Sequence, residues 1–211
     1  NQIVLLRFKD LMRARRSKEY RRLLSNASLV IPVSPSIVAG ASFLKRGKPE
    51  KFMPFDFVIR LLGILEKQRG SLYLLSSRPG DLQKTEQNLR ASFPEIRLVG
   101  RYTGHFPKEA KDNIVTAIKK ASPNLLLAGT GIRGNEKWLY THRQQLNTGL
   151  FLWCGECFDI FCGKREKPSR AVWNHGMEFI PRFFRNPFRV FFIPLFLYYL
   201  FLLLIFRIFR L

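Results

Sequence analysis

Five short apolar runs recur along the chain, and the stretches between them carry apolar residues at a helical period. The runs cover 29–33, 71–75, 96–99, 125–128 and 150–154, and the helical stretches cover 54–69, 81–93, 108–121 and 135–146. Short strands that are apolar on both faces, alternating with amphipathic helices, are typical of a mostly parallel sheet with helices on both faces. We therefore predict an α/β, Rossmann-like fold that binds ligands at the carboxyl ends of its strands.

A long uncharged segment follows this pattern near the end of the chain. The run VFFIPLFLYYLFLLLIF at 190–206 contains no charge and has arginines on both sides. A helix of that length reaches about 25 Å, slightly short of a hydrocarbon core of about 30 Å. Three placements are open for this helix. It spans a membrane, it lies in the interface, which Pro194, Tyr198 and Tyr199 favour, or it forms a buried C-terminal helix. We expect membrane contact, because a helix that is apolar on every face needs lipid or a large protein around it.

These patterns divide the chain into three parts. We assign 1–163 to the α/β domain, 164–189 to a basic aromatic neck and 190–211 to a hydrophobic membrane-anchoring tail. In the neck, phenylalanines alternate with arginines, which suits a helix at the headgroup layer. The neck residues expected to contact the membrane are Arg182, Phe183, Phe184, Arg185, Phe188 and Arg189.

The charge balance limits the choice of partner. With 36 basic and 15 acidic residues, the chain carries a formal charge of +21 and is expected to bind polyanions. Basic residues cluster at 13–22 and in the neck, yet no nucleic-acid motif accompanies them. Anionic lipid explains the same charge together with the tail, so we expect membrane lipid rather than nucleic acid as the partner. Basic residues before the tail are expected to hold the domain on the cytoplasmic side of the membrane.

Three cysteines follow one another closely in an apolar stretch that is expected to be a buried strand and its exit. Cys154 and Cys157 form a C-x-x-C pair, and Cys162 is the third. A structural zinc ion needs four ligands, and the sequence offers no second pair at a usual spacing. We predict buried core thiols, with neither a metal nor a structural disulfide.

The segment NLLLAGTGIRGNEKW carries Gly129, Gly131 and Gly134 in G-x-G-x-x-G spacing between an expected strand and an expected helix. Such glycines allow backbone amides to approach a phosphate at a helix N-terminus. The dinucleotide fingerprint normally follows the first strand, whereas this one follows the fourth expected strand. The segment is therefore interpreted either as a nucleotide-type anion site or as a purely structural turn.

The order of several motifs is more specific than any of them alone. The series NASLVIP, LYLLSSRPG, IRLVGRYTGHF, LLLAGTGIRGNEKW and CFDIFCG resembles the TagA/WecG/CpsF glycosyltransferases, family 26, over nearly the whole chain. The resemblance implies a metal-free transferase that moves an N-acetylmannosamine-type sugar from a nucleotide sugar to a polyprenyl-linked sugar. It also implies a C-terminal appendage that docks on lipid, at the cytoplasmic face of the bacterial inner membrane. By this resemblance a uridine nucleotide sugar is the expected ligand, with donor binding at Gly129, Gly131, Asn135 and Glu136.

The sequence departs from the family where chemistry is expected. The family's Pro-Asp-Gly, whose aspartate is the proposed general base, corresponds here to Pro32, Val33 and Ser34. A valine cannot accept a proton. The acceptor-side segment keeps only Asp56, which becomes the first candidate for the base. Where the family has Gln before Glu in the donor loop, this chain has Asn135, which shortens the reach of the amide.

Two hypotheses follow from these departures. The first is a pseudoenzyme that acts as a membrane-bound scaffold with a protein partner, for which Phe52, Met53 and Phe55 are the predicted surface. The second is an active transferase that adds an N-acetylhexosamine to a polyprenyl-linked acceptor in cell-envelope glycan synthesis. In that case one of four residues is the general base. Two of them have an alternative interpretation, since His105 could equally be a loop histidine without a catalytic role and Asp159 a helix N-cap. The four are Asp56, Glu136, Asp159 and His105.

Overall fold

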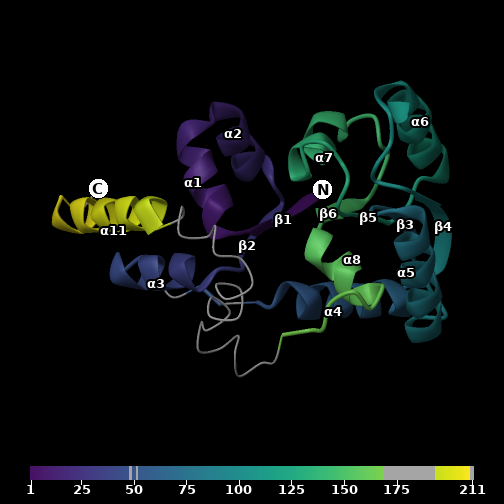
Figure 1. Cartoon of the computed structure of the whole chain (residues 1–211), viewed down its shortest axis with the longest axis horizontal. Helices are drawn as coiled ribbons and strands as arrows, with labels where there is room; N and C mark the ends of the chain where they lie inside the picture. Colours follow the sequence, from purple (N-terminus) through teal and green to yellow (C-terminus); the bar gives the residue numbers. More distant parts are fainter. Residues whose placement is uncertain (48, 51, 169–192, 210–211) are drawn as a thin grey trace.

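A single six-stranded parallel sheet organises the chain. The computed structural model describes residues 1–47, 49–50, 52–168 and 193–209. The strands run in the order β2-β1-β6-β5-β3-β4, and every neighbouring pair is parallel. The predicted α/β, Rossmann-like fold is confirmed (Figure 1). The strands are β1 (Gln2–Leu6), β2 (Leu29–Pro32), β3 (Ser71–Leu75), β4 (Arg97–Tyr102), β5 (Leu125–Ala128) and β6 (Leu150–Trp153).

Five of these strands were predicted and the sixth, β1, was missed. The strand β1 lies inside the sheet, where it pairs with β2 on one side and β6 on the other. It opens on Gln2, a polar residue that is buried because its Nε2 donates to the carbonyl oxygen of Glu136 at 3.0 Å. The strand therefore brings the start of the chain next to its C-terminal third, which fixes where the site must form.

Helices cover both faces of the sheet, and alternate strand residues contact opposite layers. Leu72 and Leu74 pack in the core beneath α4 (Pro54–Lys67), α5 (Pro79–Ser92) and α8 (Gly155–Phe161). Tyr73 and Leu75 pack on the other face, against α6 (Lys111–Ala121), preceded by the short η1 (Lys108–Ala110), and α7 (Glu136–His142). On that second face, α1 (Phe8–Arg16) and α2 (Lys18–Asn26) cover Val4 of β1.

Three helices lie outside the helical stretches predicted from the sequence, and a fourth follows β6. The helices α1 and α2 fall in the basic region, where many charges conceal the apolar positions, although Ser17 caps α2 by accepting the Tyr20 amide at 3.2 Å. The helix α3 (Pro35–Phe43) follows the expected base position. The apolar stretch around the cysteines was expected to be a strand and its exit, and the exit is the helix α8.

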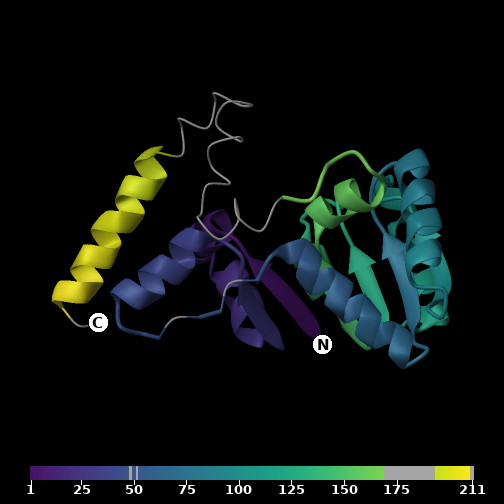
Figure 2. The ribbon, with the colours of Figure 1, turned by 90° about the horizontal axis from the view of Figure 1, so that it is seen from below.

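The tail forms a helix, α11 (Ile193–Ile208), that packs on α1 and α3. Tyr199 donates its hydroxyl to the carbonyl oxygen of Ser36 at 2.9 Å, and a side chain at Gly40 of α3 would collide with that hydroxyl. At the other end of the helix, Arg207 Nη1 donates to the carbonyl oxygen of Phe43 at 2.9 Å. Figure 2 shows α11 and α3 side by side at the end of the molecule opposite α5 and α6. None of the helices in the described ranges is both long and apolar enough to cross a membrane.

Candidate functional site

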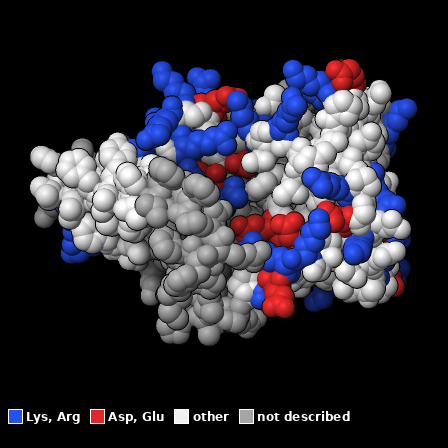
Figure 3. Space-filling model, in the orientation of Figure 1, with Lys and Arg blue, Asp and Glu red and all other residues white. Residues whose placement is uncertain are grey.

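The carboxyl ends of β1 and β6 lie side by side at a point where the chain changes faces, and we call this region the crevice. After β1 the chain enters α1 on one face of the sheet, whereas after β6 it enters α8 on the other face. Such a switch point is where parallel α/β sheets bind their ligands. In the middle of the surface shown in Figure 3, acidic side chains lie between the elements, with basic side chains around them.

Arg7 and Trp153 meet at this crevice from the two strands. The Arg7 guanidinium lies 5.0 Å from the centre of the Trp153 ring, and its Nε donates to Asp10 Oδ2 at 2.8 Å. Burial opposes ionisation of Arg7, but the charges of Asp10, Glu136 and Glu156 raise its pKa. A fixed cation stacked on an aromatic ring is suited to an anionic ligand with a flat or sugar face. The sequence analysis missed Arg7, Asp10 and Trp153 because β1 was not recognised.

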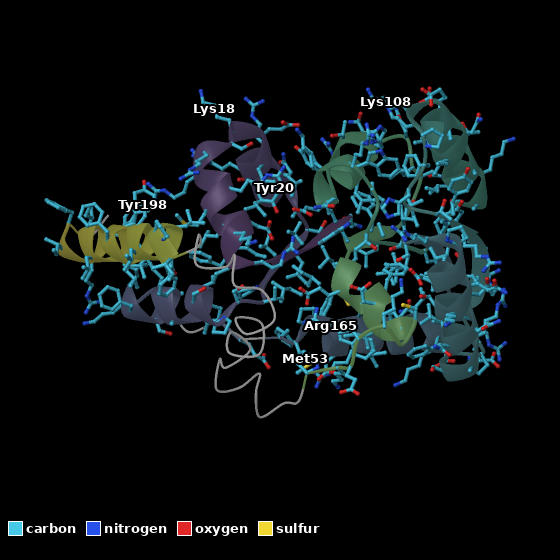
Figure 4. The ribbon with its side chains drawn as sticks, in the orientation of Figure 1. Lys18, Tyr20, Met53, Lys108, Arg165 and Tyr198 are labelled. Atoms are coloured by element: carbon cyan, nitrogen blue, oxygen red, sulfur yellow. A yellow bond between two sulfur atoms is a disulfide. The ribbon has the colours of Figure 1, made fainter. Side chains whose placement is uncertain are left out.

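Glu136 is buried beneath α2 rather than open to a ligand. Its side chain is 4% exposed, and Oε1 accepts the Tyr20 hydroxyl at 2.6 Å, a length typical of a hydrogen bond to a carboxylate. Among the described residues, Oε2 has no hydrogen-bond partner. Burial and then the charge of Glu136 raise the pKa of Tyr20, so the phenol stays neutral and donates. Figure 4 shows Tyr20 directed toward the interior of the molecule.

The glycines of the β5–α7 loop each have a structural reason to be glycine. A methyl group at Gly129 would collide with Ser76 and Phe158, and the Gly129 carbonyl accepts Trp153 Nε1 at 2.9 Å. Gly131 has φ +95°, and a Cβ there would lie 2.8 Å from the backbone of Gly104. The glycine spacing is thus accounted for by packing alone. Nucleotide binding by this loop remains a prediction.

Two further residues that the sequence predicts to bind the donor nucleotide sugar, Asn135 and Glu136, lie at the start of α7. Asn135 is the N-cap residue with φ +53°, and its side chain makes no capping hydrogen bond. Asn135 is half-buried and follows Gly129 and Gly131 in the same loop. Glu136, by contrast, turns inward to Tyr20. Asn135 thus shares the β5–α7 loop with the two glycines, whereas the Glu136 carboxylate is hydrogen bonded to Tyr20 of α2.

The family's base position is part of the core. Val33 is 5% exposed, packs in the same cluster as Met53, and donates its amide to the Leu6 carbonyl at 3.0 Å, which extends the β1–β2 ladder. Ser34 accepts the Phe8 amide at 3.0 Å and so holds the first turn of α1. Both positions therefore have a structural role.

The other candidate bases lie in different environments. Asp56 is in the first turn of α4, has a side chain 22% exposed, and forms an ion pair with Lys167. Asp159 lies inside α8, whose N-cap is Cys154, so the N-cap interpretation of Asp159 is wrong. Burial raises the pKa of Asp159 despite nearby cations. His105 is exposed on the loop after β4.

One other prediction is settled by packing, and one group of loop hydroxyls is explained by it. Met53 is buried, and Phe52 and Phe55 pack against the same core, so these side chains support the fold instead of forming an open surface. The loop residue Ser76 is fully buried and lies 3.1 Å, hydroxyl to hydroxyl, from Ser77, which in turn lies 3.2 Å from Thr130. These hydroxyls fill the space between the loops after β3 and β5.

The cysteines are buried as predicted, but two of them are joined. Cys154 and Cys157 form a disulfide across the start of α8, which corrects the expectation of free thiols, and Cys162 is a buried free thiol. The C-x-x-C spacing places both residues on the first turn of one helix, and this proximity permits the bond. Within the described part of the chain, no group of three His, Cys, Asp or Glu side chains is placed to hold a metal ion.

The predicted membrane residues fall into two groups. Arg182, Phe183, Phe184, Arg185, Phe188 and Arg189 lie outside the described residues. Tyr198 is 43% exposed, whereas Tyr199 is 7% exposed and hydrogen bonded to α3. The Tyr199 side chain thus contacts protein, and only Tyr198 of the pair is accessible to lipid.

Comparison with known proteins gives one consistent result. The family model "Glycosyl transferase WecG/TagA/CpsF family" matches residues 1–210. An N-acetylglucosaminyldiphosphoundecaprenol N-acetyl-beta-D-mannosaminyltransferase of Staphylococcus aureus strain NCTC 8325 is 21% identical over 163 residues, which cover 77% of this chain and 63% of the relative. The proteins of the same name from strains COL and N315 give the same values. This chain therefore spans less than two thirds of the length of these relatives.

Proposed function

Because the chain belongs to the WecG/TagA/CpsF glycosyltransferase family, we propose that it transfers an N-acetylhexosamine from a nucleotide sugar to a polyprenyl-linked acceptor. The observation that carries this proposal is the family match over residues 1–210. The relatives named as mannosaminyltransferases act on an undecaprenol-diphosphate-linked sugar, which supports the acceptor class and a role in cell-envelope glycan synthesis.

The donor is proposed to be a uridine nucleotide sugar bound above the β5–α7 loop. Gly129, Gly131 and Asn135 belong to the loop that follows β5, and Trp153, which donates to the Gly129 carbonyl, also stacks with the Arg7 guanidinium, a cation for the diphosphate. Glu136 acts behind the site, through Tyr20, as a positioning residue. Gln2 binds the backbone of the same turn and supports this arrangement.

The general base must be a carboxylate other than the family aspartate, since Val33 has none. Asp56 remains the first choice from the sequence, and its ion pair with Lys167 must then open when the acceptor binds. Asp10 is the alternative that the crevice adds, because it lies beside Arg7. Either carboxylate must come within hydrogen-bond reach of the acceptor hydroxyl, at about 2.6–3.2 Å.

A second function is favoured by two observations. Val33 is packed in the core at the base position, and Asp56 is already ion paired. Both features fit a pseudoenzyme that retains the family fold as a membrane-bound scaffold for a protein partner. The two functions predict different outcomes in a direct assay.

The assay follows release of uridine diphosphate from uridine diphosphate N-acetylmannosamine, with a short-chain lipid-diphosphate N-acetylglucosamine as acceptor. An active transferase releases the nucleotide only with acceptor present, and Asp56→Asn or Asp10→Asn lowers the rate by about 100-fold or more. Asp112→Asn, an exposed carboxylate on α6, is the matched control and keeps the rate. Absence of turnover, while uridine diphosphate still raises the melting temperature, would establish the scaffold instead.

We further propose peripheral attachment to the cytoplasmic face of the bacterial inner membrane. Support comes from the charge of +21 and from the apolar side chains that α11 exposes. A membrane-held acceptor also requires the enzyme to work at the lipid surface.

A further inference from the structure

The proposed transfer gives no role to the disulfide between Cys154 and Cys157. Cys154 is the N-cap residue of α8 and follows Trp153, the last residue of β6, while Cys157 lies in the first turn of the helix. Figure 1 shows α8 directly after β6. The bond therefore closes the turn by which the chain leaves the sheet at the crevice.

The turn that this disulfide closes packs against the β5–α7 loop. A Cβ at Gly155 would lie 2.9 Å from Thr130 Cγ2 and 3.2 Å from the Trp153 ring. Phe158 of the same turn is fully buried, and a Cβ at Gly129 would lie 2.5 Å from its ring. The turn thus contacts both the loop proposed to bind the donor and the aromatic ring beside it.

Trp153 connects this turn to the two groups that are proposed to face the donor. Its Nε1 donates to the Gly129 carbonyl at 2.9 Å, and the Arg7 guanidinium lies 5.0 Å from the centre of its ring. The amide of Cys154 donates to the Ala128 carbonyl at 2.8 Å, so the backbone between Trp153 and the disulfide is held by β5. A change in the turn at 154–157 must therefore act on Trp153.

The proposed location of the protein indicates that the disulfide is reversible. Cytoplasmic thiols are kept reduced, and the disulfides that do form there are usually transient and serve catalysis or redox sensing. Cys154 is 4% exposed and Cys157 is fully buried, so exchange requires the first turn of α8 to open. The two residues are three positions apart, and both thiols therefore stay close to each other when the bond is broken.

We propose that Cys154 and Cys157 form a redox switch that controls the position of Trp153 and, through it, nucleotide binding. The disulfide holds the Trp153 ring against the β5–α7 loop, and reduction releases it. The effect on nucleotide binding rests on the proposed function, whereas the effect on Trp153 does not depend on it.

Oxidation of the pair needs a low-molecular-weight disulfide, for which oxidised glutathione is the probe. One cysteine thiolate attacks a glutathione sulfur, the glutathione S–S bond breaks, and the first glutathione leaves as a thiolate that takes up a proton. The second cysteine thiolate then attacks the protein sulfur of the mixed disulfide and displaces the second glutathione. Two electrons and two protons pass from the cysteine pair to glutathione, and a dithiol such as dithiothreitol reverses the reaction.

The first test counts thiols by mass after labelling the denatured chain with N-ethylmaleimide. The chain contains three cysteines, so we expect one labelled thiol, Cys162, after equilibration with oxidised glutathione. Reduction with dithiothreitol should raise the number to three. Three labelled thiols under both conditions would overturn the proposal, as would glutathione that stays on the protein.

The second test measures how reduction changes Trp153 and its surroundings. Hydrogen exchange of its indole N–H, followed by NMR and assigned with Trp153→Phe, should become at least about tenfold faster as the turn opens. The melting temperature should fall by about 4–8 °C, because a cross-link that closes a short loop is lost. The dissociation constant of uridine diphosphate should rise by about fivefold or more, since the site is then less preorganised.

The matched control is Cys162→Ser, which removes the third buried cysteine and keeps the pair. It should respond to dithiothreitol as the unaltered chain does, whereas Cys154→Ser with Cys157→Ser should not respond. An unchanged exchange rate of Trp153 in the unaltered chain, or a response in the double variant, would refute the switch. Absence of nucleotide binding in both states, with the change at Trp153 intact, would refute the proposed donor site and support the control of Trp153.

Discussion

Replacing Tyr20 by Phe tests the buried contact that joins α2 to α7 behind the crevice. The substitution removes one hydroxyl and leaves a ring that is 1% exposed in place. It removes the hydroxyl that donates to Glu136 Oε1. The other carboxylate oxygen, Oε2, already has no hydrogen-bond partner among the described residues. The Glu136 carboxylate would then be buried with no hydrogen bond to either oxygen.

The expected cost follows from that geometry. A hydrogen bond to a charged group contributes about 1.5–3 kcal/mol, and a buried acceptor left unsatisfied brings the cost toward the upper part of that range. We therefore expect Tyr20→Phe to lower the free energy of unfolding by about 2–3 kcal/mol. For a chain of this size, that corresponds to a fall in melting temperature of about 4–12 °C.

Urea unfolding of the two proteins measures the change, with Tyr140→Phe as the matched control. The Tyr140 hydroxyl accepts Asn26 Nδ2 at 2.8 Å in an exposed position, so its loss should cost less than about 0.5 kcal/mol. In the Glu136→Gln background, the cost of Tyr20→Phe should fall by about half, because the acceptor is then neutral. A loss no larger than that of the control, or an unchanged cost in the Gln background, would refute the buried charge-assisted bond.

Three further predictions concern the loop, α8 and the tail. Gly131→Ala should lower the free energy of unfolding, measured with urea, by about 2 kcal/mol or more, because its Cβ would meet backbone at 2.8 Å. The control Gly47→Ala, at φ +89° and in open space, should cost about 1 kcal/mol. Equal costs for the two variants would contradict the close approach at Gly131. Burial raises the pKa of Asp159, so the folded state holds the proton more tightly than the unfolded chain, and stability falls as pH rises. Asp159→Asn should therefore raise the melting temperature at pH 7. This gain should disappear toward pH 4. Tyr199→Phe should cost about 1 kcal/mol through loss of its bond to Ser36, and an unchanged melting temperature would show that α11 does not dock there.

The central strands were predictable because their apolar runs are uninterrupted. The runs at Ser71–Leu75 and Leu125–Ala128 match the strands residue for residue, since each is buried on both faces. The strand β1 was missed because Gln2 is polar, and only its tertiary bond to the Glu136 carbonyl explains its burial. A contact that joins residues 134 apart in the chain leaves no trace in a local pattern.

The site was predicted only in part for the same reason. The loop at Gly129 and Gly131 follows directly from spacing, because a glycine-rich segment between a strand and a helix is a local signal. Arg7 and Trp153 meet only after β1 pairs with β6, and no spacing along the chain relates them. The inward turn of Glu136 depends on Tyr20, which was counted among the basic residues of 13–22 rather than as a buried side chain.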